Sequence, residues 1–150
     1  MLASHGFHLK CCLMQKPVPG MSDEEAILDI QRAIDYLSGL AQKHGMKINM
    51  DLDPTYVASG TMLEECFRKG VYCPPRLKDV ASAALHGQGK DITIFLGLSD
   101  NDLACEGGAF IRPREEPMVE KLEAFNRSQN YGLLKELIAE NENLIKGSLN

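Results

Sequence analysis

A strand, a Pro/Gly turn, a capped helix and a second strand follow one another over residues 7–54, and this order constrains the fold most. Apolar side chains recur at every second position of residues 7–14, the period of a β-strand. The prolines of residues 16–20 then end the strand, because proline cannot donate to a ladder. Ser22 stands three residues before Glu25, the spacing of a capping box at a helix start. Gly45 supplies the matching C-terminal stop.

The second strand covers residues 46–53 and Pro54 stops it. Two strands joined through one helix by short links form a right-handed βαβ unit, so the strands should be parallel. Because side chains alternate between the two faces of a strand, we expect one face to pack on helices and the other to be polar. The expected helix-facing side chains are Ile48, Met50 and Leu52, and the expected polar ones are Asn49, Asp51 and Asp53.

The later part of the chain continues this alternation of strands and helices. In chain order, the remaining predicted elements are helices at 61–70 and 75–87, a strand at 91–98, and helices at 117–125 and 131–145. We therefore predict an α/β fold, namely a partial (half) β/α barrel with about three parallel strands and flanking helices, plus a C-terminal helical segment. Residues 1–100 should form the partial barrel, and residues 101–150 a loop and helical extension.

Composition excludes several classes of function. The net charge of -5 argues against a nucleic-acid surface, which usually carries a basic stripe. No apolar run approaches the roughly 20 residues of a membrane span, and the N-terminus lacks the pattern of a signal peptide. The five cysteines are odd in number and have no framework spacing, so we expect reduced thiols and a cytoplasmic protein.

Ligands of parallel α/β folds bind beyond the carboxyl ends of the strands, and three stretches qualify here: residues 14–17, 49–54 and 97–100. Buried carboxylates are costly unless they are paired or hydrogen-bonded, which makes Asp51 and Asp53 the best site candidates. Two simpler interpretations remain open. Asp53 and Pro54 can merely begin a turn, and Asp51 can pair with a lysine.

Several stretches resemble one enzyme family. They are Gly6 to Ala26 with its Pro-Gly turn and acidic helix start, Asp53-Pro54 through Gly60-Thr61, Gly70-Val71-Tyr72-Cys73-Pro74-Pro75, and Phe125-Asn126-Arg127-Ser128-Gln129. This pattern is similar to that of radical S-adenosylmethionine (SAM) iron–sulfur oxidoreductases related to the archaeosine-synthase radical SAM subunit. The residue before Pro54, an asparagine in that family, is Asp53 here.

The resemblance implies a C-terminal half of a radical SAM enzyme, which lines SAM and substrate. The family's C-x₃-C-x₂-C motif, which holds a 4Fe–4S cluster, is absent from this sequence. Cys11 and Cys12 cannot replace it, because neighbours on a strand point to opposite faces. We therefore expect no metal ligands here, a 4Fe–4S cluster only if a cluster-bearing N-terminal half supplies it, and no activity of this chain alone. The cofactor expected by resemblance is SAM, with Lys16, Asn49, Asp51 and Asp53 as its binding residues.

Two other functions stay open. The chain can be a non-catalytic α/β binding or interaction protein derived from that scaffold, with its open sheet edges covered by a partner or by self-association. The remaining alternative is a small zinc-dependent hydrolase using Cys66, Cys73 and His86, although these residues lack the C-x₂₋₄-C spacing of structural zinc sites.

Overall fold

A three-stranded parallel sheet in the order β1-β2-β3 is the frame of the molecule. The structure is a computed structural model that describes residues 5–99 and 102–147. In chain order its elements are β1 (Leu9–Gln15), α1 (Asp23–His44), β2 (Ile48–Pro54), α2 (Met62–Arg68), α3 (Leu77–Leu85), β3 (Thr93–Leu96), α4 (Glu116–Ser128) and α5 (Tyr131–Gly147). The predicted α/β class and the parallel strands are confirmed.

The caps of α1 form as the sequence predicts. The backbone N–H of Glu25 donates to Ser22 Oγ over 3.1 Å, and the N–H of Ser22 donates to Glu25 Oε2 over 2.8 Å. Gly45 ends the helix with a φ of 59°, in the left-handed region that glycine adopts without a steric penalty. These bonds satisfy backbone groups that the helix itself leaves unpaired, so α1 begins and ends where its sequence requires.

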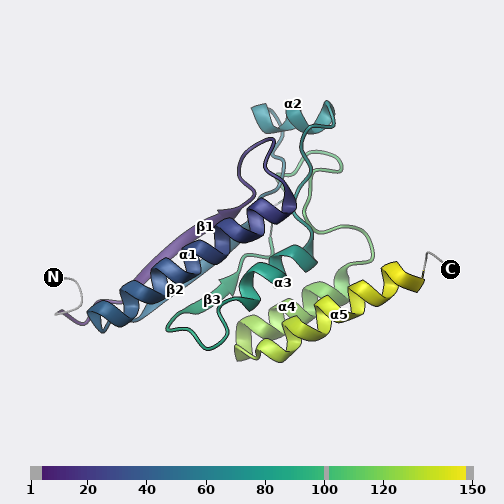
Figure 1. The fold of residues 1–150 in the computed structure, drawn as a ribbon. Helices are drawn as coiled ribbons and strands as arrows, with labels where there is room; N and C mark the ends of the chain where they lie inside the picture. Colours follow the sequence, from purple (N-terminus) through teal and green to yellow (C-terminus); the bar gives the residue numbers. More distant parts are fainter. Residues whose placement is uncertain (1–4, 100–101, 148–150) are drawn as a thin grey trace.

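The helices α1, α3 and α4 lie on one face of the sheet, and α5 packs on α3 and α4 (Figure 1). Along β2, buried side chains alternate with partly exposed ones, as predicted. Ile48, Met50 and Leu52 are at most 2% exposed and form the core with these helices. Phe110, Phe125, Leu134 and Leu137 belong to the same core, so α4 and α5 share it with the sheet.

The short helix α2 stands apart from the sheet, beyond the carboxyl ends of β1 and β2 (Figure 1). It packs on a second, small core made of Val57, Tyr72 and Cys105. Two backbone hydrogen bonds of 2.8 Å, from Val57 N–H to Gly108 O and from Cys105 N–H to Val57 O, join the two loops beneath it. Residues 55–76 and 102–111, together called the covering loops below, therefore cover the carboxyl ends of the strands.

The third strand is shorter than the predicted 91–98. Ile92 N–H donates to Lys90 O over 2.9 Å, and this turn keeps residues 90–92 out of the ladder. The outer edge of β3 is covered by side chains of α4 and its C-terminus. Asn126 accepts from Leu96 N–H over 2.8 Å and donates to Leu96 O over 2.9 Å, and Gln129 donates to Ile94 O over 2.9 Å. These two amides replace a neighbouring strand.

The change Asn126→Ala should destabilise the protein, because it leaves Leu96 N–H and C=O without their partners. We expect a loss of about 1–3 kcal/mol in the free energy of unfolding, measured by urea denaturation. Arg127→Ala, on the exposed side of the same helix, is the control and should cost less than about 0.5 kcal/mol. Equal losses of stability in the two variants would contradict the claim that Asn126 stabilises the outer edge of β3.

Candidate functional site

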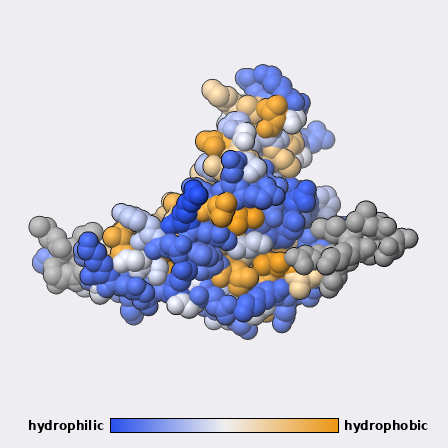
Figure 2. All heavy atoms as spheres, viewed as in Figure 1, coloured by the Kyte–Doolittle hydropathy of each residue, from blue (hydrophilic) through white to orange (hydrophobic). Residues whose placement is uncertain are grey.

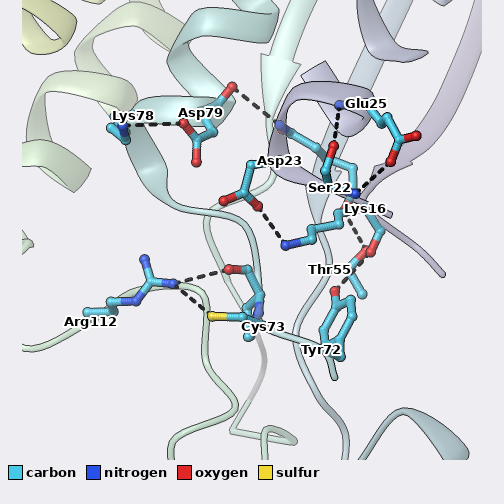
Figure 3. Close-up of polar contacts among 12 residues, drawn as sticks. Lys16, Ser22, Asp23, Glu25, Thr55, Tyr72, Cys73, Lys78, Asp79 and Arg112 are labelled. Carbon is cyan, nitrogen blue, oxygen red and sulfur yellow. Dashed lines mark hydrogen bonds and ion pairs between the residues drawn. The ribbon is translucent and has the colours of Figure 1, made fainter. Parts of the chain in front are cut away.

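Lys16 follows the carboxyl end of β1 and turns its side chain toward α1. Its φ of 59° is left-handed, and the residue is only 7% exposed. Lys16 Nζ lies 2.6 Å from Asp23 Oδ1, in the first turn of α1 (Figure 3). The same ammonium lies 5.6 Å from the centre of the Tyr72 ring, within reach of a cation–π contact. Lys16 is thus held by a carboxylate and an aromatic face.

Tyr72 links the covering loops to the sheet. Its hydroxyl donates to the carbonyl of Lys16 over 2.8 Å, and Thr55 Oγ1 donates to Gln15 O over 2.7 Å (Figure 3). Burial raises the pKa of Tyr72 to about 12, because the phenolate would lose its hydration. The Tyr72 hydroxyl therefore stays protonated and remains a donor through neutral and moderately alkaline pH.

Asn49, Asp51 and Asp53 lie on the other face of the sheet, which the described helices do not cover. The Lys10 ammonium lies 2.6 Å from Asp51 Oδ2, so the simpler interpretation of Asp51, pairing with a lysine, is confirmed. Three of the four predicted residues thus share one strand and one face. Lys16 does not join them, because its ammonium binds Asp23 on the helix side.

Asp53 is the carboxylate of this open face without an ion pair among the described residues, and it is partly buried. Desolvation raises the pKa of Asp53, and the charge of Asp51 raises it further. The carboxylate lies against Gly97, just after β3, where an added Cβ would overlap with Asp53 Oδ1. Gly97 therefore leaves the space that Asp53 occupies. Asp100, in the third predicted stretch, lies outside the described residues.

Sequence reasoning missed Lys10 as part of this face, whereas Gly97 lies in the third predicted stretch, residues 97–100. Lys10 was on the predicted strand, but only the observed register, which pairs Lys10 with Asn49 and Cys12 with Asp51, brings it beside Asp51. The signal for Gly97 was its place at the end of a predicted strand, where a ligand or side chain can approach the backbone.

A second polar cluster lies between the first turns of α1 and α3, and it too was missed. Gln15 is fully buried and its Nε2 donates to the backbone carbonyl of Asp79 over 3.2 Å (Figure 3). Gln15 Oε1 and Asp79 Oδ2 are buried and have no hydrogen-bond partner among the described residues. Burial raises the pKa of Asp79, and the nearby charge of Asp23 acts in the same direction. Asp79 Oδ1 lies 3.9 Å from Lys78 Nζ, which favours the charged form, but the buried Oδ2 has no partner, so burial has the larger effect and disfavours the carboxylate.

The cysteines and His86 do not gather into a metal site. His86 Nε2 lies 3.0 Å from Asp35 Oδ1, whereas Cys73 Sγ lies 3.7 Å from Arg112 Nη2. Within residues 5–99 and 102–147, no group of three or more His, Cys, Asp or Glu side chains is placed to hold a metal ion. Cys12 is exposed and its neighbour Cys11 is half-buried on the opposite face, where burial raises the Cys11 pKa. These thiols do not fit an iron–sulfur cluster.

No family model matches this chain, and no curated protein or solved structure is detectably similar to it. None of the helices in the described part of the chain is long and apolar enough to cross a membrane.

The change Asp79→Asn should stabilise the protein at pH 7, because the amide carries no charge to bury and can donate a hydrogen bond. The raised pKa means that wild-type protein loses stability as the pH rises through the folded-state pKa of Asp79. We expect a gain on the order of 1 kcal/mol at pH 7 in urea denaturation, vanishing near pH 3 where Asp79 is protonated in both states. The exposed Asp29→Asn is the control, and a gain that persists at low pH would contradict this origin.

The change Tyr72→Phe should remove a pH dependence at alkaline pH. Tyr72 has an ordinary pKa near 10 when unfolded and about 12 when folded, so its contribution to stability is lost as the pH rises from 10 to 12. Unfolding free energies measured at pH 9 and pH 11.5 should therefore differ more for wild type than for Tyr72→Phe. Tyr36→Phe, at a residue that is 67% exposed, should behave as wild type.

Proposed function

We propose that this chain contributes one wall of a β/α barrel and that the open face of its sheet binds SAM beside the substrate of a radical SAM enzyme. The observation that carries the proposal is the one-sided cover of the sheet. Parallel strands in sequential order bear the helices on one face and Asn49, Asp51 and Asp53 on the other.

The order of the strands supports a barrel wall rather than a doubly wound sheet. Each crossover between parallel strands is right-handed, so strands added successively in one direction place all their helices on the same face. A doubly wound sheet reverses the strand order at one point and carries helices on both faces. Here the order β1-β2-β3 has no reversal, which supports the proposal that the uncovered face is the interior of a barrel.

The two outer edges of the sheet differ, and this supports a C-terminal position of the wall in the barrel. The outer edge of β3 is closed by the amides of Asn126 and Gln129, which belong to the Phe-Asn-x-x-Gln segment of the resemblance. The outer edge of β1 carries no such cover among the described residues. A cluster-bearing half would therefore add its strand at β1.

The chemistry of the open face suits a cationic nucleoside such as SAM. Carboxylates accept hydrogen bonds from ribose hydroxyls in many nucleotide sites, and Asp53 is the free carboxylate at the carboxyl end of β2. Because Asp51 is paired with Lys10, it is the negative charge of Asp53 that favours a ligand bearing a sulfonium and an ammonium group. Since no group of metal-ligating side chains is found among the described residues, the proposed role of this chain is binding and positioning, and the reductive cleavage of SAM belongs to a partner.

A non-catalytic interaction protein is the second candidate function. The free edge of β1 and the lack of a metal site among the described residues favour it. The two candidates differ in one property, because only the first requires the open face to bind SAM.

We expect SAM to shift the amide resonances of residues 49–53 and Gly97 in ¹⁵N-labelled protein. Asp53→Asn should weaken binding at least tenfold, since a hydrogen bond to a charged group is worth about 1.5–3 kcal/mol. Gly97→Ala should have the same effect by displacing the Asp53 carboxylate. The exposed Asp29→Asn should bind as wild type does.

If the wild-type protein does not bind SAM, the proposed SAM-binding function is rejected. The second candidate, a non-catalytic interaction protein, then remains. Anaerobic reconstitution with iron and sulfide is the second measurement, and we expect no cluster absorption and no cleavage of labelled SAM. Cleavage of SAM by this chain alone would contradict its dependence on a cluster-bearing partner.

A further inference from the structure

Every second residue of β1 turns its backbone hydrogen-bonding groups away from the sheet. Leu9 N–H donates to Lys47 O and Gln15 O accepts from Thr55 N–H, so the backbone groups of the odd-numbered residues of β1 point toward β2. In a parallel ladder, the backbone N–H and C=O groups of the residues between them point to the opposite side. Lys10, Cys12 and Met14 thus present three N–H and three C=O groups to the outer edge, and no described residue is hydrogen-bonded to them.

We propose that a second copy of this chain pairs with this edge, β1 against β1, and joins the two sheets into one of six strands. Two identical edges related by a twofold axis must run antiparallel. Head-to-tail pairing with β3 is blocked, because Asn126 and Gln129 already occupy the outer edge of that strand. This pairing leaves the open face uncovered, so it does not depend on SAM binding, but it occupies the same β1 edge that a cluster-bearing half would use, and the two partners therefore exclude each other.

The side chains of β1 fit such a pair when all seven residues of the strand overlap. In that register Cys12 faces Cys12 of the second copy, and Lys10 faces Met14. The two Lys10 residues are then about 14 Å apart along the strands, beyond the roughly 8 Å over which charges act at physiological salt. On the helix side, Leu9, Cys11 and Leu13 are only half-buried in the single chain. Pairing places Cys11 against Leu13 of the second copy and completes their burial.

The charges of α1 match the same arrangement. This helix lies over β1 and β2 (Figure 1), so the twofold axis sets the two α1 helices side by side and antiparallel. The first turn of α1 is acidic, at residues 23–25, and its last turn is basic, at Lys43 and His44. The acidic end of each helix therefore lies toward the basic end of the other. On the face shown in Figure 2, hydrophilic residues surround several separate hydrophobic patches.

Light scattering of the purified chain tests the pairing. We expect a mass about twice the 16.6 kDa of one chain. Met14→Lys should restore the single-chain mass or raise the dissociation constant at least tenfold, because two lysines would face each other across the pair. Leu103→Lys is the matched control: Leu103 is 57% exposed and Met14 is 50% exposed, and Leu103 lies in the loops beneath α2. A wild-type monomer, or a dimer unaffected by Met14→Lys, would overturn the proposal.

Cross-linking tests the register. A short bis-maleimide, in which each thiol adds across one maleimide double bond, should join two chains through Cys12. Cys12→Ser should abolish the cross-linked product, whereas Cys73→Ser, which removes the other exposed thiol, should leave it unchanged. A product that survives Cys12→Ser, or that disappears with Cys73→Ser, would show that β1 does not face β1.

Discussion

The parallel hydrogen-bonded ladder of β1, β2 and β3 is the constraint on which the rest of this structure depends. Its sequential order, combined with right-handed crossovers, places the helices on a single face. The buried face of β2 then supplies the centre of the core, and the opposite face is left to polar side chains. The candidate site, the open edge and the difference between the two faces of the sheet all follow from that order.

The polar side chains on the two faces of the sheet have different partners. On the helix side, the polar groups near the strand ends stabilise the fold. Lys16 forms an ion pair with Asp23, and Tyr72 links the covering loops to the sheet by a hydrogen bond. On the open side, Asp53 keeps a carboxylate with a raised pKa against the bare backbone of Gly97. Asp53 is only partly buried, so a ligand on the open face can reach it, whereas the buried Asp79 lies among the helices. The proposed SAM site therefore rests on Asp53 and the open face.

The edges of the sheet explain why one segment far along the chain matters to the fold. Asn126 and Gln129 come from α4 and its C-terminal end, about 30 residues after β3, yet they bond to the β3 backbone as a further strand would. The sheet is thus closed at β3 and can be extended only at β1. Any assembly of this chain through its strands, with a second copy or with a cluster-bearing half, must use β1.

The sequence by itself determined the elements and their faces, because these depend on neighbours a few residues apart. The Ser22–Glu25 capping box, the Gly45 stop and the alternation of β2 are local patterns, and all were predicted. Only the tertiary structure decided which distant groups meet. The pairing of Lys10 with Asp51 needs the register of two strands, and the turn of Lys16 toward Asp23 needs the path of the chain after β1. The space beside Gly97 and the amides on β3 likewise join segments about 30 to 45 residues apart, and no local pattern carries such contacts.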